Sequence, residues 1–208
     1  IWAALIANFA RNRGYSVALI DQEGEGLTAG EIARQATEMN PRLVALVVYG
    51  QQPSASTQNM TAASELATSI REQAPSLRTI MLGGHPSALP EQTLAESNVD
   101  FVCQGEGPTT IDALLQLDDL ATDTHFAKIP GLWYRVDGRP RFTTPCPVIP
   151  EEELTTVLPG LAWDLLPMKA YRAHNWHCFE HIDERQPYAS IYTSLGCPFR
   201  CTFCCINA

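Results

Sequence analysis

Short apolar runs alternate with segments of helical length over residues 1–120, and this alternation limits the possible folds more than any other feature. The runs are residues 16–20 (SVALI), 43–49 (LVALVVY), 79–82 (TIML) and 101–103 (FVC). The longest run is β-branched and almost free of polar residues, as is typical of strands buried on both faces of a parallel sheet. Amphipathic segments of helical length separate the runs: residues 28–39, 59–73, 90–97 and 109–117. This βαβ order predicts a doubly wound α/β domain with a parallel sheet.

The two ends of this pattern suggest how the domains are arranged. Residues 1–13 are expected to form a helix that ends at Gly14. Because no strand precedes this helix, we expect that the first strand of the sheet was cut away. Residues 133–142 alternate around Asp137-Gly138, which is a strong hairpin signal. The expected division is an α/β domain over 1–128, a hairpin and linker over 129–187, and the first strand of a second domain within 188–208.

The composition narrows the class of partner. The chain has 208 residues and a formal net charge of −9, and it contains no Lys/Arg-rich run. This charge argues against a nucleic acid that is held mainly through its phosphates. No run of 18 apolar residues occurs, and the basic residues near the amino terminus follow the apolar ones, the reverse of a secretory signal. We therefore expect a cytoplasmic protein that acts on a small molecule, without a membrane span.

Four of the seven cysteines lie within residues 196–205 (GCPFRCTFCC). An odd number of cysteines, clustered late in a chain without a signal peptide, favours metal or redox chemistry over a disulfide framework. Cys197, Cys201 and Cys204 form a C-x3-C-x2-C motif, and three thiolates at such spacings can bind a 4Fe-4S cluster and leave one iron open. Zinc is the main competitor, but structural zinc sites want four ligands, and no second CxxC pair exists.

Residues 193–204 (TSLGCPFRCTFC) resemble the signature of the radical S-adenosylmethionine enzymes. The resemblance implies that Cys197, Cys201 and Cys204 hold the cluster, that S-adenosylmethionine occupies the open iron, and that Phe203 lies beside its adenine. It further implies a 5'-deoxyadenosyl radical as the reactive species, and an electron donor such as flavodoxin or ferredoxin.

An α/β domain followed by a linker and this motif resembles the cobalamin-binding subgroup of those enzymes, in which the first domain is Rossmann-like or flavodoxin-like. The loop over residues 21–26 (DQEGEG) is similar to the D-x-H-x-x-G loop of cobalamin modules through Asp21 and Gly26. Glu23 stands where that loop has a histidine. Glu23 has no imidazole to offer cobalt, so the resemblance implies that this loop does not ligate the metal.

Ligands of open parallel sheets bind beyond the carboxyl ends of the strands, so the loops at that edge hold the candidate ligand-binding residues. Four glycine-bearing loops are expected there, and together they predict a shared ligand site. The candidates for cobalamin contact are Asp21, Glu23, Gly26, Ser54, Gly83, Gly84, His85, Gly105 and Glu106. His85 is the only histidine expected on this edge, although a hydrogen-bonded loop histidine is the more common role.

The other cysteines and histidines are more simply explained by structural roles. Cys205 is expected to be a small buried hydrophobe rather than a zinc ligand or a redox partner. His174, His177 and His181, with Cys178, have the spacing of one helical face and allow a metal site. The aromatic residues among them favour an amphipathic linker that covers apolar surface.

The combined resemblance implies a cobalamin-dependent radical enzyme that transfers a methyl group to an unactivated carbon. Cyclisation or ring rearrangement is the alternative reaction, because architecture does not fix chemistry. The sequence stops shortly after the motif, so we expect a fragment that lacks its catalytic barrel and has no turnover. Catalytic residues are therefore not assigned. Two other classes remain open: a non-catalytic cobalamin or nucleotide module, and a zinc-stabilised interaction domain.

Overall fold

A computed structural model describes residues 1–50, 55–122, 125–173, 181, 183–184, 186–191, 196, 199 and 201–202. The chain divides into two compact units. Residues 1–28 pack with 152–196, and residues 29–151 form the main body of the other unit. The unit built on residues 29–151 contains the sheet.

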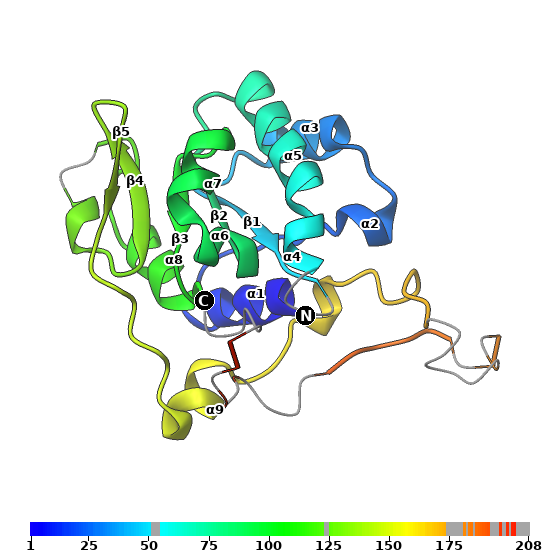
Figure 1. Ribbon diagram of the computed structural model, residues 1–208. Helices are drawn as coiled ribbons and strands as arrows, with labels where there is room; N and C mark the ends of the chain where they lie inside the picture. Colours follow the sequence, from blue (N-terminus) through cyan, green and yellow to red (C-terminus); the bar gives the residue numbers. More distant parts are fainter. Residues whose placement is uncertain are drawn as a thin grey trace. The chain divides into compact units, whose positions relative to one another are not determined.

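Five strands form one sheet in the order β1-β2-β3-β4-β5 (Figure 1). The strands are β1 (Val44–Val48), β2 (Thr79–Gly83), β3 (Phe101–Cys103), β4 (Leu132–Val136) and β5 (Arg139–Phe142). The first three are parallel to one another, while β4 and β5 are antiparallel to their neighbours. All five residues of β2 are buried, as expected for a central strand covered on both faces. The α/β class expected from the sequence is confirmed.

Helices connect the parallel strands, as βαβ units require. Helix α3 (Ala29–Met39) precedes β1 and packs against α5 (Met60–Gln73). Helix α5 contacts β1, while α6 (Gly84–Ala88) and α7 (Pro90–Glu96) contact β2 and β3 respectively. These crossover helices lie together beside the sheet in Figure 1. The remaining helices of this unit are α4 (Ala55–Gln58), α8 (Pro108–Leu115) and the 3-10 turn η1 (Phe126–Lys128).

The hairpin predicted around Asp137-Gly138 is confirmed, and it extends the parallel sheet instead of standing apart from it. Both turn residues have positive φ, 49° and 75°, as a two-residue turn of the I′ type requires. Strand β4 pairs with β3 through Val102 and Trp133. Phe126 packs edge-on between Phe101 and Tyr134, so aromatic contacts fix the hairpin to the last parallel strand.

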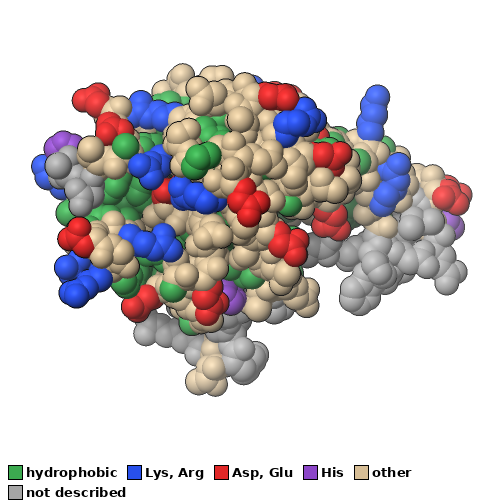
Figure 2. Space-filling model, turned by 90° about the horizontal axis from the view of Figure 1, so that it is seen from above, with side chains coloured by type: hydrophobic (Ala, Val, Ile, Leu, Met, Phe, Trp, Pro, Cys, Tyr) green, Lys and Arg blue, Asp and Glu red, His purple; other side chains and the backbone are tan. Residues whose placement is uncertain are grey.

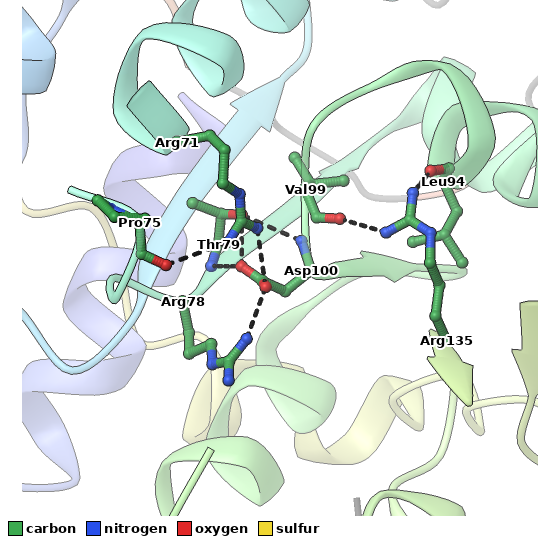
Figure 3. A network of polar contacts seen from close by, with 8 residues as sticks. All are labelled: Arg71, Pro75, Arg78, Thr79, Leu94, Val99, Asp100 and Arg135. Atoms are coloured by element: carbon green, nitrogen blue, oxygen red, sulfur yellow. Dashed lines mark hydrogen bonds and ion pairs between the residues drawn. The ribbon is translucent and has the colours of Figure 1, made fainter. Parts of the chain in front are cut away.

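A network of charges closes the amino ends of the parallel strands (Figure 3). Asp100, whose side chain is 10% exposed, accepts ion pairs from Arg71 and Arg78, each at 2.8 Å. Its other carboxylate oxygen accepts the backbone N–H of Thr79 at 2.8 Å and the Thr79 hydroxyl at 3.0 Å. Beside it, Arg135 donates to the carbonyl oxygens of Val99, at 2.8 Å, and Leu94. The network joins α5, β2, β3 and β4 at one end of the sheet.

The other unit is built on α1 (Trp2–Asn12), whose buried face consists of Ala4, Leu5, Ile6, Ala7, Phe9 and Ala10. Its end at Gly14, with φ of 86°, agrees with the expected helix stop. Asn8 donates to the carbonyl of Gly160 at 3.0 Å, and Arg11 pairs with Asp164 at 2.8 Å. The short elements are α2 (Gln22–Glu25) and α9 (Leu154–Val157), together with the 3-10 turns η2 (Glu151–Glu153) and η3 (Trp163–Leu165).

Two expected strands are not formed where the structure describes them. Residues 16–20 make no strand, because an apolar run becomes a strand only when a neighbour supplies ladder hydrogen bonds, which its composition does not reveal. Residues 188–191 are likewise irregular, and the rest of the strand expected over 188–194 lies outside the described residues.

No helix among the described residues is long and apolar enough to cross a membrane. On the face seen in Figure 2, basic and acidic side chains are interspersed.

Candidate functional site

The carboxyl ends of β1, β2 and β3 lie together, because Val48 pairs with Gly83 and β3 continues the parallel ladder beside β2. Gly83 has a φ of +150°, and a Cβ on it would lie 2.0 Å from the carbonyl oxygen of Val48. A Cβ on Gly50, just past β1, would lie 2.1 Å from the Cβ of Ala55. Close packing therefore explains both glycines, against the end of β1 at Gly83 and against α4 at Gly50, without any need for ligand approach.

Ser56 connects the first two strand ends. Its side chain is buried, and the hydroxyl donates to the carbonyl oxygen of Val48 at 2.5 Å. The same hydroxyl accepts the backbone N–H of His85 at 2.9 Å. Thr57, the next residue in α4, places its hydroxyl 3.1 Å from Nδ1 of His85. The imidazole of His85 is half-buried, and a bond at Nδ1 leaves Nε2 available to a ligand.

A second hydroxyl connects the ends of β2 and β3. Ser87 is buried in α6 and accepts the backbone N–H of Gly105 at 3.0 Å. The following residue, Glu106, is half-buried, and burial raises the pKa of its carboxyl group, although the backbone N–H of Ile149 opposes this shift. Gly107, with φ of +99°, turns the chain into α8. His85, in α6, and Glu106, in the loop after β3, thus follow adjacent strands and are held by buried serines.

The loop expected to resemble D-x-H-x-x-G lies in the other unit, and its polar groups are used locally. Asp21 caps α2 by accepting the backbone N–H of Gly24 at 3.0 Å, and its second oxygen accepts the Tyr171 hydroxyl at 2.5 Å. Burial and the neighbouring Asp21 carboxylate raise the pKa of Tyr171. Gly26 ends α2 in the left-handed conformation, while Glu23 is exposed. Asp21 and Gly26 therefore have structural roles in this loop.

Several predicted site residues lie outside the described residues. They are Ser54, Cys197, Cys204 and Phe203, together with Cys205, His174, His177 and Cys178. Cys201 is described and is exposed. His181 is also exposed, with Nδ1 at 3.4 Å from a carboxylate oxygen of Glu184. Within the described part of the chain, no group of three or more His, Cys, Asp or Glu side chains is placed to hold a metal ion.

Sequence reasoning missed the hydroxyl residues Ser56, Thr57 and Ser87, which organise the loops after β1 and β2. These residues sit in short helices that had been expected to be loops. The sequence did contain a signal for these three residues: each lies at most seven positions after a glycine that follows or ends a strand. Small hydroxyl residues near such glycines can satisfy the backbone groups that a tight turn leaves unpaired.

The described edge fits a large ligand with polar substituents better than it fits a small anion. Glycines, two buried serines and an imidazole follow β1 and β2, whereas the described parts of those loops carry no Lys or Arg side chain. The hydroxyls of Ser56 and Ser87 already bond backbone groups of the chain, so this edge offers a ligand the His85 imidazole and nearby backbone groups, without strong local charge. This donor set suits the amide-rimmed macrocycle of a corrinoid.

Known proteins similar to this chain include methyltransferases and a cyclase. An uncharacterized methyltransferase of Pyrococcus horikoshii, PH0819, is 30% identical over 97% of this chain and 39% of its own length. The anaerobic magnesium-protoporphyrin IX monomethyl ester cyclase of Synechocystis is 27% identical over 92% and 34% respectively. Cytidylyl-2-hydroxyethylphosphonate methyltransferase of Streptomyces wedmorensis is 26% identical over 86% and 35%. The chain thus spans less than two fifths of the curated relatives it matches.

Two solved structures share the fold. The radical S-adenosylmethionine methyltransferase TsrM from Kitasatospora setae, solved with cobalamin and a [4Fe-4S] cluster, aligns with a TM-score of 0.58 at 16% identity. That alignment covers 72% of this chain and 27% of TsrM. The cobalamin-dependent S-adenosylmethionine radical enzyme OxsB, with aqua-cobalamin bound, aligns with a TM-score of 0.60 at 18% identity, over 79% of this chain and 22% of OxsB.

The family assignment rests on a match that covers more than half of the chain. Residues 1–115 match the B12 binding domain family. This range contains β1, β2, β3 and the glycine and hydroxyl loops that follow them. The chain belongs to the B12-binding domain family.

Proposed function

We propose that this chain is the cobalamin-binding part of a radical S-adenosylmethionine enzyme that transfers a methyl group to an unactivated carbon. The observation that carries the proposal is the joined edge of β1, β2 and β3, where Ser56 and Ser87 hold the loops bearing His85 and Glu106. The family match over residues 1–115 supports the corrinoid as its ligand. Similarity to proteins named methyltransferases supports the reaction.

The second half of the proposal concerns the cysteine motif. Cys197, Cys201 and Cys204 would hold a 4Fe-4S cluster, since three thiolates at this spacing match its ligand requirement. When bound, the cluster and S-adenosylmethionine supply a 5'-deoxyadenosyl radical, and cobalamin supplies the methyl group. Phe203 would lie beside the adenine of S-adenosylmethionine. An external one-electron donor of the flavodoxin or ferredoxin type belongs to this proposal.

On the described edge, residues of this chain would bind and orient the corrinoid. His85 would present Nε2 to the corrinoid, because the Thr57 hydroxyl lies at Nδ1. The backbone amides near Gly84 and Gly105 would approach the macrocycle or its side chains closely. Ser54, next to α4, would add a further hydroxyl. Cyclisation is the second candidate reaction, favoured by the similarity to the magnesium-protoporphyrin IX monomethyl ester cyclase.

An anaerobic titration of the chain with hydroxocobalamin, followed by its absorption spectrum, tests the corrinoid half. We expect stoichiometric binding that weakens about tenfold when His85 becomes alanine, because a positioned polar contact is lost. The exposed His125 supplies a matched control, and His125→Ala is expected to leave the affinity unchanged. Absence of corrinoid binding by the folded chain would refute this half.

Reconstitution with iron and sulfide, followed by metal analysis, tests the cluster half. We expect about four irons per chain, lost in Cys201→Ala and retained in Cys146→Ala. Cys146 lies outside the motif and serves as the control. Zinc in place of iron would overturn the radical proposal and favour a zinc-stabilised domain. Iron without corrinoid would preserve the radical chemistry but remove the role given to the B12-binding fold.

A further inference from the structure

Two cysteines outside the motif lie close together behind the loop of Gly105 and Glu106. Cys103 ends β3 and is fully buried, whereas Cys146 follows β5 and is half-buried. Cys103 pairs with Leu132 in the sheet, and a Cβ on Gly131, the residue before Leu132, would lie 2.9 Å from the Cβ of Cys146 and 3.2 Å from the hydroxyl oxygen of Thr110. The Thr110 hydroxyl itself donates to the carbonyl of Pro130 at 2.8 Å. Cys146 and the Thr110 hydroxyl therefore lie together at the end of β3 that Cys103 forms.

The backbone around the pair keeps Cys146 in place. Gly131 donates its N–H to the carbonyl of Thr144 at 2.7 Å, and Thr143 donates its own N–H to the carbonyl of Leu132 at 3.1 Å. A Cβ on Gly131 would lie 2.9 Å from the Cβ of Cys146 and 2.7 Å from the carbonyl oxygen of Gln104. Only glycine at residue 131 leaves room for Cys146 to approach the end of β3.

We propose that Cys146 and Cys103 form a redox modification site, in which a low-molecular-weight disulfide oxidises the pair to an intramolecular disulfide. Cys146 reacts first, by attacking the oxidant's disulfide, because it alone of the two is accessible. Its thiolate displaces one thiol from the oxidant and forms a mixed disulfide, and the thiolate of Cys103 then displaces the second thiol. The two thiol protons leave with the two reduced oxidant molecules, so electrons and atoms balance.

The surroundings make this site slow to react under neutral conditions. Burial raises the pKa of Cys103 to about 12. Burial, and to a lesser extent the nearby Glu106 carboxylate, raises the pKa of Cys146. Because only the thiolate attacks a disulfide, oxidation accelerates as the pH rises toward the pKa of Cys146. The pair thus stays a dithiol unless the oxidant is abundant.

Formation of the bond would fix the segment over residues 143–149 against the end of β3. That segment already reaches the loop of the proposed ligand edge, because the backbone N–H of Ile149 is bonded to the Glu106 carboxylate. The proposal concerns the thiol pair itself and does not depend on cobalamin binding. Its test therefore fails or succeeds independently of the proposed function.

The test uses oxidised glutathione and a chain in which Cys178, Cys197, Cys201, Cys204 and Cys205 are serine. At pH 8.5 we expect both remaining thiols to disappear, with a mass loss of about 2 Da and no retained glutathione. The melting temperature should rise by about 5 °C or more, since a new cross-link restricts the unfolded chain. Peptide mapping of the unsubstituted chain should recover the same cross-linked peptide, so a folding defect of the substituted chain does not block the test.

Three variants sharpen the result. Cys103→Ala should stop at a stable glutathione adduct on Cys146, whereas Cys146→Ala should leave Cys103 unmodified. Glu106→Gln should speed the first step roughly threefold at pH 7.5, because a neighbouring negative charge is removed. Persistent free thiols at both positions, or a glutathione adduct on Cys146 that Cys103 never resolves, would overturn the proposal.

Discussion

The two ends of the same parallel strands are built from different chemistry. At the amino ends, the Asp100 carboxylate gathers two arginines and the start of β2 into a charged network. At the carboxyl ends, the neighbours are glycines and single hydroxyls such as Ser56 and Ser87. The charged network ties several elements together through one carboxylate, whereas each serine only bridges two neighbouring segments and adds no charge. We infer that the first end stabilises the sheet and the second is kept for binding.

The largest effect is expected from filling the glycine at the carboxyl end of β2. Gly83→Ala should destabilise the chain by about 3 kcal/mol or more, because its Cβ would meet the Val48 carbonyl oxygen at 2.0 Å. Urea unfolding followed by circular dichroism measures the change. Gly138→Ala is the matched control at positive φ with nothing within 4 Å, and it should cost only about 1 to 2 kcal/mol. Equal costs at both positions would mean that close packing at the strand end is not what requires glycine.

At the amino end, Asp100→Asn should lower the free energy of unfolding by about 2 to 3 kcal/mol, because two arginines lose their charged partner. The exposed pair of Arg34 with Glu38 gives the control, since Glu38→Gln should cost about 0.5 kcal/mol or less. Corrinoid affinity should be unchanged in Asp100→Asn wherever the variant is folded. A large loss of affinity would remove the functional distinction between the two ends.

The same carboxylate predicts a pH dependence. Burial alone would raise the pKa of Asp100, but the hydrogen bonds from Arg71 and Thr79 and the arginine charges outweigh it, and the pKa is lowered. A lowered folded-state pKa contributes stability above the unfolded value near 3.9, and this stability is lost as the pH falls through the folded-state pKa. Wild-type stability should therefore fall in acid more steeply than that of Asp100→Asn. Parallel acid profiles would contradict the network.

Removing one buried hydroxyl at the carboxyl end should have a smaller effect on stability. Ser56→Ala leaves the Val48 carbonyl and the His85 N–H without this partner, and we expect a loss of about 1 to 2 kcal/mol. Corrinoid affinity should fall as well, unlike in Asp100→Asn, because the loop of His85 loses its anchor. Thr37→Ala is the control, because that hydroxyl bonds only within its own helix.

The smallest change in stability is expected for the exposed Thr57. Thr57→Val removes the hydroxyl at Nδ1 of His85 and should alter stability by about 0.5 kcal/mol or less. Corrinoid affinity should nevertheless weaken measurably if the threonine orients the imidazole. An unchanged affinity, measured by the same spectral titration, would leave His85 without the orienting contact that we assign to it.

Local sequence signals predicted much of the second unit correctly. The strands over 43–49, 79–82 and 101–103 are confirmed within one or two residues at each end, because their apolar runs are bounded by glycine or polar turns. The Asp137-Gly138 turn was equally predictable, since both residues tolerate positive φ. The strand predicted over residues 16–20 is wrong, because an apolar pattern does not specify a pairing partner.

The sequence predicted which loops meet at the carboxyl edge of the sheet, but not how those loops are built. Open α/β sheets bind ligands at their carboxyl edge, and glycines marked the loops after β2 and β3. The sequence did not reveal that Gly83 is required by the Val48 carbonyl, or that Ser56 and Ser87 join the strand ends. These contacts link residues from different elements, so no local pattern carries them.

By itself, the sequence determined the α/β class, the parallel strands, the hairpin turn and the cysteine motif, because each depends on residue type and short-range spacing. Only the tertiary structure decided that β4 and β5 extend the sheet, that Asp21 is engaged by Tyr171, and that Cys146 packs beside Gly131 at the end of β3. Those outcomes depend on which distant backbone segments meet, and that is settled by packing of the folded chain as a whole.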